Sequence, residues 1–405
     1  MRTRTTAVAG ACLLALAVTG CGTTGDGGGG GGGDATTAAG LFTPPDIPMK
    51  KSLGQGEGQV NILAWPGYAE DGSTDPKVDW VSPYEKKTGC QANVKYFGTS
   101  DEAVNLMKTG EYDVVSASGD ASLRMVAAGD VAPVNTDLVP NYQDIQPWLK
   151  NRSWNSVRGQ MYGVPHGWGA NLLMWRTDKV EPAPTSWSSV FEKNPPYAGT
   201  VTAYDSPIYI ADAALYLKNS RPALGIENPY ALDQKQLQAA VDVLTTQRQN
   251  INEYWSNYLK QLQAFTSGDT TIGTTWQFIV NLAQDDKVPV KAILPDEGST
   301  GWSDTWMVGA DAQNPNCAYE WMDWIASPKV QAQVAEYFGE APANPKACDY
   351  TSDPGFCTTY HADDKAYADK IWYWTTPITQ CLDGRKDVQC TDYGDWTTAW
   401  TEVKG

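Results

Sequence analysis

Tryptophan and polar or acidic residues follow several predicted β-strands, where their side chains can meet a ligand. The residues at these points are Trp65, Ser118, Asp205, Trp276, Trp302 and Asp304. An aromatic ring attracts a cation through its quadrupole, and a carboxylate pairs with an ammonium group. A single tryptophan among 17 is more often a core residue. Because the pattern recurs at equivalent points, it favours a clamp for an organic cation.

Alternating strands and helices position these residues in the first half of the chain. Short apolar runs predict strands over 60–64, 94–97 and 112–115. Helical spacing predicts helices near 78–84 and over 101–108, the second capped by Ser100. This alternation is typical of an α/β protein with a parallel sheet and right-handed crossovers.

The second half repeats the pattern with different spacing. Strands are predicted over 200–204 and 270–275, with an apolar helix through Leu217 and another helix over 258–265. Asp233 is the predicted cap of a helix between them. In open α/β sheets ligands bind beyond the carboxyl ends of strands, which is where the candidate residues lie.

Residues 59–405 exceed the size at which single cores stop growing, so we expect two lobes. The predicted first lobe comprises 59–165 and a return segment over 301–345. The predicted second lobe is 166–300. A C-terminal, disulfide-rich segment over 346–405 is expected to pack on the lobes.

The N-terminus predicts export and lipid anchoring. Arg2 and Arg4 precede an apolar stretch over 7–18 that is too short to span a bilayer. The stretch ends in Val18-Thr19-Gly20-Cys21, which resembles a bacterial lipobox with Cys21 as the acylated residue. We therefore predict a signal peptide over 1–20. The glycine-rich segment over 21–58 is interpreted as a flexible tether.

The net charge of the mature chain narrows the classes of molecule that the protein could bind. Without residues 1–20 the basic count falls by two, from 30 to 28, against 47 acidic residues, which gives −19. This surface disfavours nucleic acid and anionic lipid and mildly favours cationic ligands, although it could also serve solubility alone. No later segment has the length of a transmembrane helix.

The six remaining cysteines predict disulfides, as is common in exported chains. Cys348–Cys357 and Cys381–Cys390 would each close a short polar loop, which leaves Cys90 with Cys317. Fifteen pairings are formally possible. A zinc site is the rival interpretation, but the sequence has no CxxC motif and only two histidines, so we expect no metal.

Most of residues 60–405 resemble the polyamine (spermidine and putrescine) binding proteins of ABC importers. The similar segments are Ile62-Leu63-Ala64-Trp65-Pro66-Gly67-Tyr68, Glu111-Tyr112-Asp113-Val114-Val115, Gly163-Val164-Pro165-His166-Gly167-Trp168-Gly169, Tyr204-Asp205-Ser206-Pro207, Ser267-Gly268-Asp269, Ile272-Gly273-Thr274-Thr275-Trp276, Pro295-Asp296-Glu297-Gly298, Trp302-Ser303-Asp304 and the C-terminal run from Ala399 to Gly405. Their order and spacing together carry the resemblance.

The resemblance implies an α/β, two-lobed periplasmic-binding-protein fold of type II, with a ligand cleft between hinged lobes. It implies ligand contacts at the six residues named first, with Trp302 stacking along a methylene chain and Asp304 binding an amine. It also implies a monomeric receptor without cofactor, which delivers its cargo to importer membrane subunits.

Three positions depart from the family pattern. Tyr209 and Ile279 stand where relatives of this type carry acidic residues, and Glu340 replaces an aromatic residue. Tyr209 and Glu340 are nevertheless kept among the candidate ligand contacts, and the departures affect one distal amine site. The cargo is therefore expected to be a polyamine, or a shorter, singly charged or different amine.

Two alternatives remain open. The same fold could bind a sugar or a thiamine-like compound, because tryptophan-rich clefts also stack on sugars. A secreted glycoside hydrolase would need a tuned carboxylate pair, and a Ser-His-Asp enzyme would need His166 or His361. Carboxylates on different lobes disfavour a hydrolase, so we expect a binding protein and no enzyme.

Overall fold

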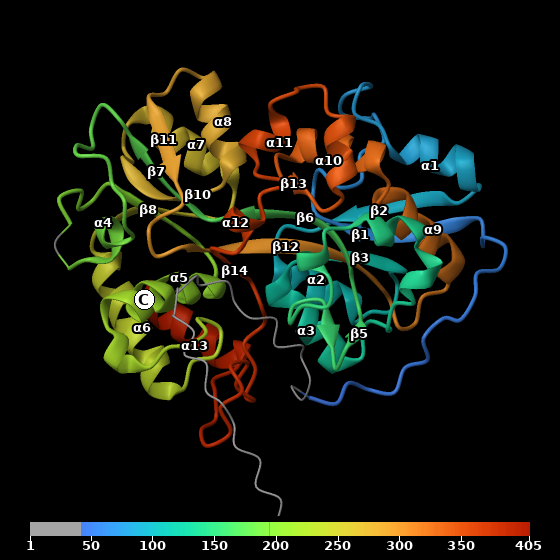
Figure 1. The fold of residues 1–405 in the computed structure, drawn as a ribbon, viewed down its shortest axis with the longest axis horizontal. Helices are drawn as coiled ribbons and strands as arrows, with labels where there is room; N and C mark the ends of the chain where they lie inside the picture. Colours follow the sequence, from blue (N-terminus) through green and yellow to red (C-terminus); the bar gives the residue numbers. More distant parts are fainter. Residues whose placement is uncertain (1–41, 194) are drawn as a thin grey trace, which may run out of the picture. The chain divides into compact units, whose positions relative to one another are not determined.

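The computed structural model describes residues 42–193 and 195–405. Over these residues the chain forms two large sheets, of seven and five strands, and one short hairpin, with helices packed around them (Figure 1). The predicted signal peptide, Cys21 and most of the predicted tether lie outside the described residues.

The first sheet carries most of the candidate residues. Its strands are β1 (Gln59–Ala64), β2 (Gln91–Tyr96), β3 (Val114–Ala117), β6 (Val164–Ala170), β12 (Ser299–Val308), β13 (Ala341–Pro342) and β14 (Ile371–Tyr373). They are ordered β13-β6-β12-β3-β1-β2, with β14 paired to β12. β1 is parallel to β2 and β3, whereas β12 is antiparallel to β3 and β6. This parallel unit confirms the predicted strand–helix–strand pattern.

The second sheet contains β7 (Leu172–Arg176), β8 (Val201–Tyr204), β9 (Ile251–Trp255), β10 (Ile272–Thr275) and β11 (Val290–Ile293), ordered β11-β7-β10-β8-β9. β8 is parallel to both β9 and β10, as a doubly wound half requires. The hairpin consists of β4 (Ser156–Val157) and β5 (Gln160–Met161).

Thirteen α-helices occur among the described residues. They are α1 (Val81–Thr88), α2 (Ser100–Met107), α3 (Gly119–Ala128), α4 (Ser188–Phe191), α5 (Ile210–Ser220), α6 (Gln234–Arg248), α7 (Tyr258–Ser267), α8 (Gln277–Asp285), α9 (Pro315–Ile325), α10 (Pro328–Phe338), α11 (Phe356–Thr359), α12 (Lys365–Ala368) and α13 (Tyr393–Lys404).

Helix caps explain where two of these helices begin. Asp233 caps α6 through a reciprocal capping box with Gln236, as predicted. The prediction of Ser100 as the cap of α2 is wrong, because Thr99 accepts the hydrogen bond from the backbone N–H of Glu102. The Ser100 hydroxyl instead donates to Asp120 Oδ1 at 2.9 Å. The Ser100 hydroxyl therefore bonds to the buried Asp120 carboxyl group and does not cap the helix.

The chain changes sheets at Asn171, between β6 and β7. Its backbone N–H donates to Thr300 O at 2.9 Å, and its side-chain amide donates to Thr300 Oγ1 at 2.7 Å. The Ser299 hydroxyl in turn donates to the Asn171 carbonyl. These hydrogen bonds join the β6–β7 connection to the start of β12 at the point where the two sheets meet.

The core of the first sheet explains many tryptophans. Trp80, Trp168, Trp306 and Trp321 are fully buried against apolar residues around β1, β6 and β12. The expectation that isolated tryptophans are more often core residues therefore holds for these four.

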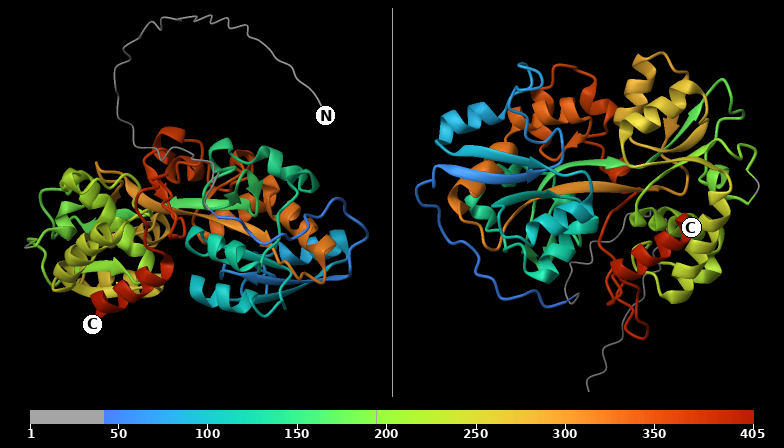
Figure 2. Two further views of the ribbon diagram at one scale, coloured as in Figure 1. Left: turned by 90° about the horizontal axis from the view of Figure 1, so that it is seen from below. Right: turned by 180° about the vertical axis from the view of Figure 1, so that it is seen from behind.

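The C-terminal segment contacts both sheets. β14 pairs with β12 of the first sheet, and α13 packs on α6 beside the second (Figure 2). None of the helices in the described part of the chain combines the length and apolarity needed to cross a membrane.

Three disulfides join the six cysteines as predicted: Cys90–Cys317, Cys348–Cys357 and Cys381–Cys390. The first links residues 227 positions apart, and the other two each close a loop with a separation of 9. The long-range bridge ties the start of β2 to α9, across the first lobe.

Mass mapping of peptides from non-reduced, exported protein should recover these three linked pairs. The sulfurs are already bonded in the folded chain, so alkylation before reduction should label none of the six cysteines. Free thiols or exchanged partners at these positions would contradict the assignment.

Candidate functional site

Four of the predicted site residues directly follow strands, as expected. Trp65 follows β1, Ser118 follows β3, Asp205 follows β8 and Trp276 follows β10. The other two, Trp302 and Asp304, lie within β12.

Asp304 is positioned by an irregularity in β12. The strand pairs Asp304 with Gly167 of β6, and the register shifts between Asp304 and Thr305. Such a bulge redirects a side chain relative to the regular alternation. On the other edge Thr305 pairs with Ala117, the residue before Ser118. The carboxylate thus lies at the carboxyl ends of β1 and β3.

A tyrosine joins two acidic groups at this edge. Tyr68 Oη lies 2.8 Å from Asp304 Oδ2 and 2.9 Å from Glu340 Oε2. All three side chains are buried, with exposed fractions of 0%, 3% and 1%. Within the described chain Asp304 Oδ1 makes no hydrogen bond. We call Tyr68, Asp304 and Glu340 the acidic cluster.

Burial determines the charge of the cluster. Desolvation raises the pKa of Asp304 to about 6, although the hydroxyls of Ser118 and Tyr68 act in the opposite direction. Desolvation, together with the nearby charge of Asp304, raises the pKa of Glu340 well above its usual value. With a pKa of about 6, the Asp304 carboxylate is charged at neutral pH, whereas burial favours the protonated form of Glu340.

His166 lies beside the cluster but does not neutralise it. Its Nε2 is 3.5 Å from Glu340 Oε1, and the side chain is 1% exposed. Burial lowers the pKa of His166 to about 3, so the ring is neutral and this contact is no ion pair.

Two glycines of β6 make room for the site. A Cβ atom at Gly167 would overlap the Glu340 carboxyl group, and one at Gly169 would lie 2.8 Å from Trp302 Cζ2. The Gly-Trp-Gly segment therefore forms a surface on which Glu340 and Trp302 can lie.

Aromatic side chains from both sheets face each other beside the cluster. The rings of Trp302 and Trp276 are 6.3 Å apart, and Trp276 Nε1 donates to Asn171 Oδ1 at 2.9 Å. The indole N–H groups of Trp65 and Trp302 are buried and make no hydrogen bond within the described residues. Buried donors usually have a partner, so these two are suited to a ligand.

A small pocket borders this aromatic wall. It has a volume of about 20 Å³, and its lining includes Trp168, Trp276, Trp302, Glu340 and Tyr360. This volume holds about one water molecule. This pocket by itself is therefore too small for an amine ligand.

Two predicted contacts lie apart from the acidic cluster. Asp205 accepts hydrogen bonds from Lys404 Nζ at 2.7 Å and from Trp400 Nε1 at 3.3 Å. Tyr209 is 1% exposed in the core of the second lobe, where its hydroxyl accepts from Gln247 Nε2 at 3.0 Å. Ile279, the other departure in this lobe, is also fully buried.

Sequence reasoning missed the roles of Tyr68 and Lys404. Tyr68 stands in the turn after β1, and the available signal was its place in the Ile62–Tyr68 segment that resembles the polyamine-binding family. Lys404 reaches Asp205 across a separation of 199 residues, which no local pattern indicates.

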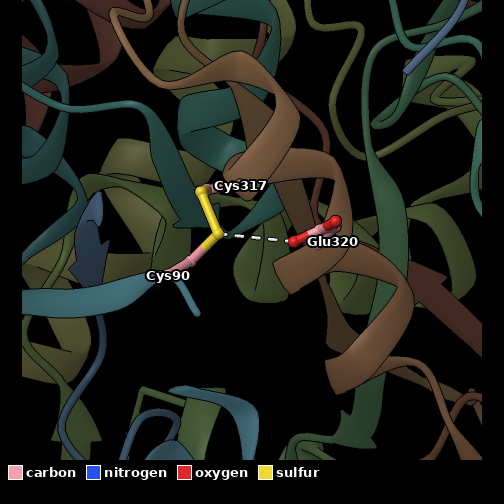
Figure 3. Close-up of side chains that lie close together, drawn as sticks. All are labelled: Cys90, Cys317 and Glu320. Carbon is pink, nitrogen blue, oxygen red and sulfur yellow. Dashed lines mark hydrogen bonds between the residues drawn. A yellow bond between two sulfur atoms is a disulfide. The ribbon is translucent and has the colours of Figure 1, made fainter. Parts of the chain in front are cut away.

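Cys90, Cys317 and Glu320 form the group of potential metal ligands found among the described residues (Figure 3). Glu320 Oε2 lies 3.3 Å from Cys90 Sγ. Both sulfurs belong to the Cys90–Cys317 disulfide, whereas metal binding by cysteine requires thiolates. The group is therefore a structural bridge with a neighbouring carboxylate.

Comparison with known proteins agrees with this geometry. The chain is 23% identical over 284 residues to the spermidine/putrescine-binding periplasmic protein of Escherichia coli, covering 67% of this chain and 78% of that protein. It is 24% identical over 349 residues to a putrescine-binding periplasmic protein of Pseudomonas aeruginosa, covering 80% and 88%.

A solved structure shows the same fold. The spermidine/putrescine ABC transporter substrate-binding protein of Streptococcus pneumoniae superposes with a TM-score of 0.65 and 18% identity, covering 85% of this chain and 98% of that chain. The two-lobed fold inferred from the sequence is thereby confirmed.

The family profile described as bacterial extracellular solute-binding protein matches residues 79–358, more than half of the 405-residue chain. Members of this family bind solutes and are not enzymes, which confirms the expectation that the chain is no hydrolase. The chain belongs to the bacterial extracellular solute-binding proteins.

Proposed function

We propose that this protein is the extracellular receptor of an ABC importer for a polyamine or a related organic cation. The observation that carries the proposal is the buried Asp304 carboxylate, which has one oxygen without a partner in the described chain and lies beside Trp302. A buried charge is costly unless it is paired, so this site favours a cationic ligand. The names of the relatives in E. coli and P. aeruginosa support the same ligand class.

The proposed ligand contacts combine charge and stacking. Asp304 pairs with an ammonium group, and Trp302 and Trp276 cover the methylene chain from the two lobes. Trp65 and Ser118 offer an indole N–H and a hydroxyl at the same sheet edge. Glu340, as a neutral acid, offers a hydrogen bond. Asp205 and Tyr209 are left out of this set because each already has a partner within the chain.

Lobe closure is the proposed mechanism. The open form admits the ligand, and the closed form buries it between Trp302 and Trp276. Because the ligand binds the closed form better, it shifts the population toward that form. We propose that the lobes are 59–165 with 301–345 and 166–300, and the hydrogen bonds at Asn171, where the chain passes from one sheet to the other, support a hinge there. The loaded receptor then docks on the importer's membrane subunits.

A thermal-shift panel tests this function. A ligand that binds only the folded state raises the melting temperature, by a free energy that grows with its concentration over Kd. We expect primary amines to raise it, and sugars and thiamine to leave it unchanged. A shift with a sugar and none with any amine would replace the cationic ligand with a neutral one.

We also propose that Cys21 carries the lipid that anchors a monomeric receptor to the outer face of the cytoplasmic membrane. The Val18-Thr19-Gly20-Cys21 run and the glycine-rich segment after it support this proposal. A tether of this composition lets a folded body stand away from the membrane.

Replacing Cys21 with serine should release the protein from the membrane fraction with an unchanged melting temperature, because the anchor lies outside the folded lobes. Fractionation and immunoblotting of cells that express each form measure this. Replacement of the half-buried Cys348 and Cys357 pair with serine serves as the control, since it removes cysteines without touching the anchor. Membrane retention of Cys21→Ser would mean that another anchor exists.

A further inference from the structure

The number of charges in the site determines how many ammonium groups a cargo can place there. Three acidic residues were expected to face the ligand: Asp205, Asp304 and Glu340. In the structure Asp304 and Glu340 share Tyr68 as a partner, whereas Asp205 pairs with Lys404, and these partners decide which carboxylate is available.

The contacts of Tyr68 require a proton on one of the two carboxyl groups of the acidic cluster. The Tyr68 hydroxyl has one proton, yet its oxygen lies within hydrogen-bond distance of carboxyl oxygens of both Asp304 and Glu340, at 2.8 and 2.9 Å. Tyr68 can donate to only one of them. The second contact requires a carboxyl proton on Asp304 or Glu340. Burial and the nearby charge of Asp304 raise the pKa of Glu340 well above its usual value, which favours an arrangement in which Glu340 donates to Tyr68 Oη and Tyr68 donates to Asp304. The buried position of Glu340, against the neutral ring of His166, agrees with this arrangement.

Asp205 is neutralised by the chain itself. Lys404 Nζ lies 2.7 Å from Asp205 Oδ2, 4.3 Å from the centre of the Tyr254 ring and 6.0 Å from that of Trp400. A carboxylate flanked by aromatic faces is the environment that binds an organic ammonium group. Lys404, in the last turn of α13, therefore occupies the second-lobe cation site as a tethered ligand.

The remaining buried acid near the cluster also has partners. Asp120 accepts from the Ser100 hydroxyl at 2.9 Å and from the Tyr393 hydroxyl at 3.5 Å, while the nearby Arg124 pairs with Asp101 at 2.6 Å. Asp304 is thus the carboxylate that the described chain leaves with an unpaired oxygen next to the aromatic wall.

We infer that the cargo is a primary amine with a single positive charge, whose other end is neutral, and that Lys404 excludes diamines and polyamines. The inference rests on the proposed function and narrows its substrate class. A second ammonium group would enter the cleft without a free carboxylate, and burying an unpaired charge is strongly unfavourable.

Calorimetry with three probes of equal chain length tests this: butylamine, 4-amino-1-butanol and putrescine. The native protein should bind one of the two monoamines at least about tenfold more tightly than putrescine, since the diamine buries an unpaired charge. Lys404→Met keeps the length of the side chain and frees Asp205, so it should reverse the preference. Lys404→Arg keeps the positive charge and should retain the native preference.

Lys404 is partly exposed, so the variants are expected to fold, and their melting temperatures verify this. Tighter binding of putrescine than of both monoamines by the native protein would overturn the inference and leave the proposed function intact. An unchanged preference in Lys404→Met would also overturn it. Binding of no amine by any form would overturn the proposed function itself.

Discussion

Asp304→Asn should weaken binding of the best amine by about 10- to 100-fold, because a charged hydrogen bond contributes about 1.5–3 kcal/mol. The substitution keeps the shape of the side chain and its contact with Tyr68, and it removes the charge of the Asp304 carboxylate. Isothermal titration of the native and variant proteins measures the change.

The matched control for Asp304→Asn is Asp296→Asn. Asp296 is exposed in the turn before β12, so its loss should leave affinity unchanged. If Asp304→Asn bound the amine as tightly as the native protein, recognition would not depend on this charge.

The same group sets the pH dependence of binding. The pKa of Asp304 is about 6, so the carboxylate is charged above this pH and protonated below it. Amine affinity should therefore fall about tenfold for each pH unit below 6. Asp120 also has a pKa of about 6, and it is still present in Asp304→Asn. If Asp304 causes the pH dependence of binding, the affinity of Asp304→Asn should therefore vary much less with pH than that of the native protein.

Asp212→Asn should stabilise the protein by about 4 kcal/mol at pH 7. Asp212 lies in the first turn of α5 with an exposed fraction of 3%, and neither of its carboxyl oxygens makes a hydrogen bond in the described chain. Burial raises its pKa from the ordinary 3.8 to about 8, while the Thr300 hydroxyl acts weakly in the opposite direction.

The sign of this effect follows from proton linkage. The folded state holds Asp212 protonated, so its contribution to stability is complete below pH 3.8 and is lost as pH rises toward 8. The gain from Asp212→Asn should accordingly be small at pH 4 and largest near pH 8. Urea unfolding at both pH values measures it.

Asp242→Asn is the control for the stability experiment, because Asp242 is exposed on the neighbouring helix α6. It should change the free energy of unfolding little at either pH. A gain from Asp212→Asn that was equal at pH 4 and pH 8, or a loss at pH 8, would contradict the assignment of a buried, protonated Asp212.

Local patterns sufficed to predict the parts of this molecule that depend on short segments. The strand ends at Trp65, Ser118 and Trp276 follow from alternating apolar residues that stop at a polar turn. Asp233 was recognisable as a helix cap from its own position. The pairs Cys348–Cys357 and Cys381–Cys390 followed from their short spacing, and the third pair from the two cysteines left over.

The arrangement of charges could not be predicted, because it depends on contacts between distant segments. Glu340 meets Tyr68 across 272 residues, and Lys404 meets Asp205 across 199. The sequence indicated that Asp205 could bind a cation, and its carboxylate does pair with one, but the cation belongs to the same chain. The protonation of Glu340 likewise results from burial, which residue type alone does not reveal.

The central claim is that the cleft recognises a positive charge. Titration of the native protein at pH 7.5 with 4-amino-1-butanol, and then with 1,4-butanediol, tests it most directly, because the two differ by the replacement of an ammonium group with a hydroxyl group. We expect heat of binding from the amine and none from the diol, since the Asp304 carboxylate requires a cationic partner. Equal binding of the diol and the amine would contradict the account.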